Sequence, residues 1–334
     1  MTLRQWMAVG CAVTLSTGNV FGVASTDIQT AVNQIQSDST LISGWMTGQL
    51  KYVVPFNSTA GNVVPSQLKV FGVEVGVEGV VSGTEVDVAS LRNLPTSIVD
   101  TTKIDAFGRF PMPAVLGHAK IGLPFGLDAG VRIGGIPKRS FDKDTTHVSV
   151  KNSIIGIDVR KKLIEEGIAK PFGLTVGANF TRASGSIDAT TPYHSKGQAV
   201  VNGTTYNSSL DGTGTGHSEW DVKSYGVQAI LNKQMFFINP YVGASVNKNA
   251  GSLSTSITTT GTETITNAGN PADTSSQTFT PVVGAASDSP HKWDIRALAG
   301  LEFTLLPFVK LGLQGEYAGT KNIAGALGLR VQFR

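Results

Sequence analysis

The chain has 334 residues, a net charge of +3 and one cysteine, and it contains 39 glycines. Charged residues make up 15% of the sequence, below the roughly 25% of an average soluble domain. This composition argues against disorder, excludes a disulfide scaffold and a cysteine-ligated metal cluster, and gives no electrostatic sign of nucleic-acid binding.

The first segment is predicted to be a secretory signal peptide, residues 1–24. Arg4 supplies a positive start, residues 6–15 are apolar, and Gly22-Val23-Ala24 offers small residues to a signal peptidase. Cleavage after Ala24 would remove Cys11 and leave a mature chain without cysteine. A lipoprotein acylation site at Cys11 is the alternative. After this segment, no apolar run reaches the length of about 18 residues that suggests a transmembrane helix.

Residues 25–66 are predicted to form a separate N-terminal segment. Asp27 can cap a helix, and apolar residues from Ile28 to Ile35 recur at helical spacing. We therefore expect a short amphipathic helix within residues 27–48. The sequence leaves two roles open: a plug inside the domain that follows, or a loose periplasmic tether.

Residues 67–334 show apolar residues with a period of two, which predicts β-strands. The strands are expected at about 68–82, 113–123, 127–137, 147–161, 171–184, 219–232, 240–249, 292–305, 309–317 and 323–333. This makes ten strands. Twelve to fourteen strands are the alternative, because residues 41–56 or 84–112 could hide more.

Short and long connections alternate strictly between these strands. The short ones fall at about 124–126, 162–170, 233–239 and 306–308, and the longest at 84–112, 185–218 and 250–291. A soluble β-sandwich has no reason to sort its connections in this way, whereas an outer-membrane barrel has short periplasmic turns and long extracellular loops. The 250–291 connection could rise as a β-hairpin through residues 255–265.

Strands with an apolar face in hydrocarbon must close into a barrel, because an open edge leaves backbone groups unpaired at several kcal/mol each. The predicted fold class is therefore all-β, an antiparallel transmembrane β-barrel of about ten strands with a short N-terminal helical segment. Lipid of the outer membrane would be its surroundings. A soluble secreted β protein is the alternative.

Aromatic residues at the strand ends predict two girdles at the membrane interfaces. Several follow a proline, as in Pro124-Phe125 and Pro307-Phe308. The predicted girdle residues are Phe125, Phe172, Tyr241, Phe308 and Phe333 at the short-turn end, and Trp220, Trp293 and Tyr317 at the other end.

Charged residues of both signs are predicted to face inward, opposite the apolar positions of each strand. These residues are Glu74, Glu78, Asp128, Arg132, Asp158, Arg160, Asp294, Arg296, Glu302, Lys310, Glu316 and Arg330. A polar network of salt bridges that fills a narrow lumen is one interpretation, and a selective pore is the other. Mixed signs argue against strong ion selectivity, because selective filters use rings of one sign.

The turn at 306–308 predicts one strand register. If residue 306 is the centre of the turn, residues whose numbers sum to 612 face each other. This register sets Glu302 against Lys310 and Arg296 against Glu316, and opposite charges in direct cross-strand pairs are favourable.

No catalytic residue, metal site or cofactor is predicted. The five histidines are His118, His147, His194, His217 and His291, and three of them fall in long polar connections. The sequence contains no Gly-x-Ser-x-Gly, His-Glu-x-x-His or P-loop motif.

The last residues, Leu327-Gly328-Leu329-Arg330-Val331-Gln332-Phe333, resemble the C-terminal signal of bacterial outer-membrane proteins, although Arg334 follows the aromatic. This resemblance implies recognition by the barrel assembly machinery. Residues 41–334 resemble an uncharacterised family of exported outer-membrane barrels, through Gly44-Trp45, Phe71-Gly72-Val73-Glu74-Val75 and Pro171-Phe172-Gly173-Leu174. The architecture also loosely resembles long-chain fatty-acid transporters.

Three functions follow as hypotheses. The first is a passive channel or transporter for small solutes, which could be hydrophobic. The second is a structural or interaction barrel that displays long extracellular loops. The third is an outer-membrane hydrolase, which no sequence motif supports.

Overall fold

The computed structural model describes residues 28–61, 68–96, 109–143, 145–166, 171–201, 204–319 and 322–333. The predicted signal peptide lies outside these residues and stays a prediction. The helical elements are α2 (Ile28–Thr59), α3 (Val88–Arg92) and the short 3-10 turn η2 (Pro124–Gly126). The strands are β1 (Val73–Glu85), β2 (Arg109–Leu123), β3 (Leu127–Lys143), β4 (Thr146–Ile164), β5 (Gly173–Val201), β6 (Thr204–Asn232), β7 (Ile238–Asn267), β8 (Asn270–Asp288), β9 (Trp293–Leu306), β10 (Val309–Ala318) and β11 (Asn322–Phe333).

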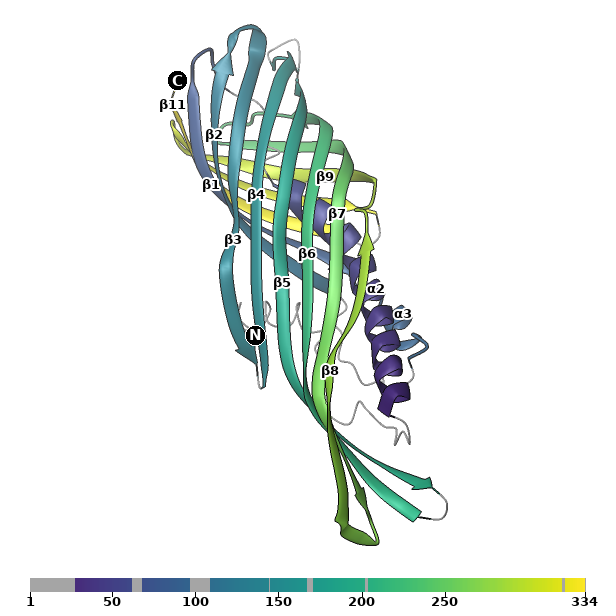
Figure 1. The fold of residues 1–334 in the computed structure, drawn as a ribbon. Coiled ribbons are helices and arrows are strands. Elements are labelled where there is room, and N and C mark those ends of the chain that lie inside the picture. Colours follow the sequence, from purple (N-terminus) through teal and green to yellow (C-terminus); the bar gives the residue numbers. More distant parts are fainter. Residues whose placement is uncertain are drawn as a thin grey trace.

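Ten of these strands form a closed antiparallel ring (Figure 1). The order is β1-β2-β3-β4-β5-β6-β7-β9-β10-β11, and β11 closes the ring on β1 from Val73↔Phe333 to Thr84↔Asn322. Each of the ten predicted strands corresponds to one strand of the ring, so the predicted ten-stranded barrel is confirmed. Residues 41–56, one of the places where further strands could have been hidden, lie inside α2.

Two of the predicted long loops are strands, and this part of the prediction is wrong. β5 and β6 continue to Val201 and Thr204 and stay paired from Gly185↔Trp220 to Val201↔Thr204. β7 runs on to Asn267 and pairs with β8, which is outside the ring, so residues 255–265 do belong to a hairpin. Threonine explains the difference: its β-branched side chain suits a strand, whereas the composition of these segments suggests a loop.

The outer face of the ring is apolar. Along β9, β10 and β11 the exposed positions alternate with buried ones, and Ile295, Leu313 and Leu327 are 68%, 51% and 56% exposed. β1, β3, β4, β6 and β7 carry exposed valine, isoleucine or leucine in the same way. Large exposed apolar surfaces of this kind mark contact with a membrane or a protein.

Six of the predicted girdle residues lie on this outer surface. Phe125, Phe172, Trp293, Phe308, Tyr317 and Phe333 are between 45% and 88% exposed. They lie at the ends of strands or in the turn η2.

Trp220 and Tyr241 are each only 3% exposed, so their assignment to the girdles is wrong. Both face a glycine that leaves room for the ring inside the barrel: Trp220 is the cross-strand partner of Gly185, and Tyr241 that of Gly300. The Tyr241 hydroxyl also donates a hydrogen bond to Gln314 Oε1 at 2.9 Å. A partnered polar tip allows such a ring to be buried.

Helix α2 is longer than predicted and ends inside the ring (Figure 1). Its residues Leu50, Val53 and Val54 are buried in an apolar cluster with inward residues of the barrel wall, among them Val222 and Leu253. Its N-terminal half lies along β8, where Ser43 Oγ donates to Gly284 O at 3.0 Å. The described helices include none that is long and apolar enough to cross a membrane.

A proline inside α2 connects the helix to the wall. Pro55 has no N–H and cannot bond to the carbonyl of Lys51 four residues earlier. The backbone N–H of His291 donates to this carbonyl instead, at 2.9 Å. The segment between β8 and β9 thereby fixes the helix at the rim of the ring.

Candidate functional site: the interior of the barrel

All twelve charged residues that the sequence assigns to the interior are buried in the structure, each at 8% exposure or less. They belong to strands β1, β3, β4, β9, β10 and β11, with Asp128 at the start of β3. Burial of so many charges is tolerable only when they are paired or hydrogen-bonded. Their contacts divide them into a group around the end of α2 and a group closer to the short turns.

The first group binds the C-terminal end of α2. Arg132 of β3 donates to Ser58 O at 2.7 Å, to Ala60 O at 3.2 Å and to Thr181 Oγ1 at 2.8 Å. The last carbonyls of a helix have no partner within it and carry the negative end of the helix dipole. The guanidinium of Arg132 therefore satisfies the groups that the helix leaves free.

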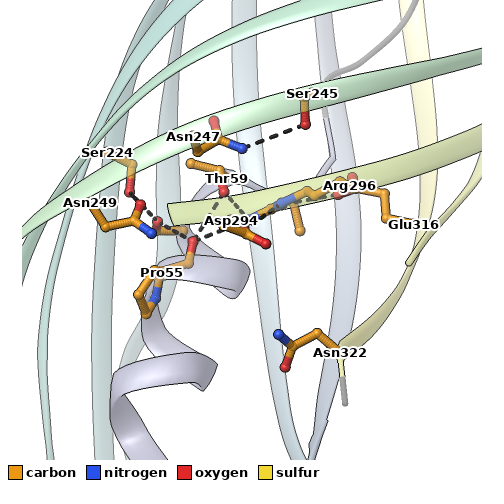
Figure 2. A network of polar contacts seen from close by, with 12 residues as sticks. Pro55, Thr59, Ser224, Ser245, Asn247, Asn249, Asp294, Arg296, Glu316 and Asn322 are labelled. Carbon is orange, nitrogen blue, oxygen red and sulfur yellow. Dashed lines mark hydrogen bonds and ion pairs between the residues drawn. The ribbon is translucent and has the colours of Figure 1, made fainter. Parts of the chain in front are cut away.

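Arg296 of β9 binds the same helix end from the other side of the ring (Figure 2). It donates to Pro55 O at 3.4 Å and to the hydroxyl of Thr59. Its guanidinium carbon lies 4.3 Å from the centre of the Phe56 ring. β3 and β9 are five places apart in a ring of ten strands, so the two arginines hold the helix between opposite walls.

Carboxylates and amides complete the contacts of the helix end. Glu316 Oε1 accepts from the backbone N–H of Gly61 at 2.6 Å. Asn57 donates to Met112 O at 2.8 Å and to Ser82 Oγ at 3.0 Å, and accepts from Asn152 at 3.2 Å. The end of α2 thus replaces the water that would otherwise solvate these wall residues.

The second group lies between the helix end and the short turns. Lys310 Nζ is 2.8 Å from Glu302 Oε1, Arg160 Nε is 2.9 Å from Asp158 Oδ2, and Arg330 bridges Glu302 to Glu74, at 3.1 Å from Glu74 Oε2. Asp128 is the cross-strand partner of Arg160. Both signs occur side by side.

Sequence reasoning missed other members of this interior. His118 and Lys120 of β2 are 3.3 Å and 3.4 Å from Glu74 Oε1. Their alternation with Ala119 and Ile121 was the available signal, but the prolines at 111 and 113 obscure the period at the start of β2. Gln314, Gln332 and Tyr241 are uncharged members that a search for charge does not find.

The register predicted from the turn at 306–308 is wrong by two residues. Gly312 is the partner of Glu302 and Leu298 that of Glu316, because the pairing shifts between Val309 and Lys310. The structure nevertheless brings Glu302 to Lys310 and Arg296 to Glu316 as diagonal neighbours, with N–O distances of 2.8 Å and 3.0 Å.

Three histidines pair with aspartates in the parts of β3 to β6 that extend past the ring. His147 and His217 Nδ1 lie 2.6 Å from Asp142 and Asp188, and His194 pairs with Asp211. In the described part of the chain, none of these rings has a hydrogen bond to a serine or threonine hydroxyl. The described part of the chain also contains no cluster of three or more His, Cys, Asp or Glu side chains that could hold a metal ion.

A cavity of about 800 Å³ lies at the short-turn end of the barrel. Lys69, Lys162, Glu166, Asn232 and Gln234 are among its lining residues. The backbone N–H of Gln234 donates to Glu166 at 2.8 Å and holds two of the short connections together. The mouth at this end is therefore hollow and polar.

Comparisons with solved structures match barrels at low similarity. The chain is similar to the translocator domain of the autotransporter NalP from Neisseria meningitidis, with 10% identity, 92% of this chain and 98% of that chain covered, and a TM-score of 0.30. It is similar to the transport unit of the autotransporter AIDA-I from Escherichia coli, with 10% identity, 87% and 99% covered, and a TM-score of 0.27. The toluene transporter TbuX from Ralstonia pickettii has 9% identity, 80% and 90% covered, and a TM-score of 0.26.

A search of curated proteins finds no match. A family model, by contrast, matches nearly the whole chain, from residue 16 to residue 333. The resemblance to an uncharacterised family that the sequence motifs indicate is thereby confirmed, and the chain belongs to the family of unknown function DUF6588.

Proposed function

We propose that this protein is an outer-membrane channel for small solutes and that α2 closes its lumen in the state described. The observation that carries the proposal is the position of the helix end between Arg132 and Arg296. A helix held by the inner walls occupies the space that a solute would need. Opening would require the end of α2 to leave this place.

The membrane location rests on the apolar outer face. Leucine, isoleucine and valine are exposed around the ring, and burying them in lipid is favourable at about 25 cal/mol per Å². In this arrangement the short turns face the periplasm. Export by the signal peptide and recognition of β11 by the assembly machinery belong to the same proposal.

The contacts of the helix end favour a plug that can be released. Apart from the apolar cluster around Leu50, Val53 and Val54, these contacts are hydrogen bonds between wall side chains and the backbone, amide and hydroxyl groups of the helix end, which water can replace when the helix moves. The net stabilisation of such a bond is about 0.5–1.5 kcal/mol, or about 1.5–3 kcal/mol when one partner is charged. The passage behind the plug carries both signs of charge, which favours transport of small solutes without strong ion selectivity.

A reversible disulfide tests the plug. Ser58 Oγ of α2 and Ser224 Oγ of β6 are 3.4 Å apart, and the predicted mature chain has no other cysteine. The variant Ser58→Cys/Ser224→Cys should conduct less than wild type in planar bilayers when oxidised and recover with a reductant. Each single cysteine variant is the control. Equal conductance of the oxidised and reduced forms would refute a channel that opens when the end of α2 leaves the lumen.

The long hairpins favour a second candidate, a barrel that also presents a binding surface. β5, β6 and β7 have 29, 29 and 30 residues, whereas about 9–11 residues suffice to span the membrane. Shortening the β5–β6 and β7–β8 hairpins to the rim should leave conductance intact and abolish attachment of cells to host or matrix surfaces. Unchanged attachment would argue against this candidate.

A hydrolase is the least supported candidate. The histidine rings on the hairpins bind carboxylates and have no hydroxyl partner among the described residues. We propose that these pairs stabilise the hairpins and take part in no reaction.

A further inference from the structure

The side chains on the outward face of β5, β6 and β7 change from aliphatic to aromatic and then to charged where the apolar surface ends. Phe180 and Tyr225 form a tilted ring pair with centroids 5.0 Å apart. Tyr225 and Trp293 are both cross-strand partners of Lys248 and are 53% and 50% exposed. The last apolar side chains of this face are therefore aromatic, as is typical of a membrane interface.

A basic row borders these rings. It consists of Arg182, Lys223 and Lys248, one on each of three neighbouring strands, and all three are exposed on the outward face. Arg182 and Lys223 are direct cross-strand partners, and Lys248 lies diagonally from Lys223, whose partner on β7 is Ala250.

Two like charges in a direct cross-strand pair destabilise a sheet unless something compensates them. Asp221 compensates Arg182 through a bidentate contact of 3.0 Å and 2.5 Å. Among the described residues, Lys223 and Lys248 have no carboxylate within ion-pair distance. The row is therefore left with an excess of positive charge beside an apolar surface.

A polar hollow of about 460 Å³ lies on the same face beyond the basic row. Its lining includes Ser184, Ser186, His217, Glu219, Asp221 and Ser254. Hydroxyl and carboxylate groups of this kind bind the hydroxyls of a sugar. The carboxylates of Asp221 and Glu219 outnumber the one lysine of this lining, Lys151, which favours the basic row over the hollow as the place for phosphate.

The three zones follow one another as the parts of a phosphorylated glycolipid do: acyl chains, then the phosphorylated sugars that carry them, then further sugars. We propose that the outward face of β5–β7 binds a phosphorylated glycolipid of the outer leaflet, with its phosphate on Lys223 and Lys248, beside the Arg182–Asp221 pair. This inference rests on the membrane position proposed above and is independent of whether the lumen conducts. A phosphate ion in solution would lack the acyl chains that contact Phe180 and Tyr225.

Binding of lipid A to the detergent-purified mature protein tests the proposal. Trp293 gives the signal, because Trp6 lies in the predicted signal peptide, Trp45 and Trp220 are buried, and Trp293 is the cross-strand partner of Lys248. We expect lipid A to change its fluorescence. Dephosphorylated lipid A lacks the phosphate, and the phosphate of phosphatidylcholine is offset by its own choline cation, so both should bind about tenfold more weakly. Inorganic phosphate at the same concentration should have no effect.

The variant Lys223→Gln/Lys248→Gln should lose lipid A binding by about tenfold or more. Lys161→Gln/Lys233→Gln, two exposed lysines at the short-turn end, is the matched control and should bind as wild type does. Gel mobility before and after boiling shows that each variant is folded, and conductance should be unchanged in both. Wild-type affinity of the first variant, or equal binding of phosphatidylcholine, would overturn the proposal.

Discussion

Arg296 and Glu316 form an ion pair although they are not cross-strand partners. Arg296 Nη1 lies 3.0 Å from Glu316 Oε2, while the residue directly opposite Glu316 is Leu298. Diagonal neighbours on one face of a sheet lie about 7–8 Å apart, which a long side chain can span. The same guanidinium reaches Pro55 O in α2, so one residue connects the wall, its neighbouring strand and the helix.

Replacing Arg296 by methionine should destabilise the barrel by about 3–5 kcal/mol, because Asp294 and Glu316 would stay buried without their cation. The free energy of unfolding in urea, measured in detergent micelles, checks this value. Arg296→Met/Glu316→Gln should cost less than the sum of the two single changes, since the residues share one network. Lys196→Met, an exposed change on β5, should stay within about 0.5 kcal/mol of wild type. Additive effects of the two interior changes would contradict the network.

Replacing Leu313 by arginine tests the lipid-facing surface. Leu313 is 51% exposed in the middle of β10, and an arginine at the bilayer midplane costs about 2–4 kcal/mol. Leu305→Arg is the matched control, because Leu305 lies one residue from the end of β9 and the cost near an interface falls to about 0–1 kcal/mol. Folding yields in vesicles should follow this order, and equal yields would mean that Leu313 does not face lipid.

The ring could be predicted from the sequence because its strands alternate cleanly. In β9 and β10 most exposed apolar residues are followed by an inward polar residue or glycine, as in Ile295-Arg296 and Leu313-Gln314. A period of two assigns both faces at once. The ten strands and the burial of the twelve charges follow from this pattern alone.

Features that depend on contacts between distant residues could not be predicted. Trp220 and Tyr241 face inward because Gly185 and Gly300 lie opposite them, and this pairing is invisible in the local sequence. The register of β9 and β10 depends on a shift in pairing between Val309 and Lys310, which the turn residues do not predict. The position of α2 depends on arginines that bind its last carbonyls and lie more than 70 residues away in the sequence.

The N-terminal half of α2 is expected on the outer side of the membrane, because it lies along β8 beyond the rim and the short turns are expected to face the periplasm. Ser37→Cys is an exposed position on this half. A maleimide that cannot cross the membrane should label it on intact cells. Lys233→Cys, in the connection between β6 and β7, should react only after the cells are permeabilised. Labelling of the second position alone would invert the proposed topology.

His217 should make the β5–β6 hairpin sensitive to pH. The hydrogen bond with Asp188 raises the pKa of His217 above its usual value of 6.5, and Asp188 is its direct cross-strand partner. A raised pKa in the folded state means that the stabilisation is complete below about pH 6.5 and is lost as the pH rises through the folded pKa. An NMR titration of the ring should show this raised pKa. Asp188→Asn should lower this pKa and weaken the pH dependence of the hairpin's resistance to protease, although Glu219 still raises the pKa of His217. Identical titrations of wild type and Asp188→Asn would show that Asp188 does not raise the pKa of His217.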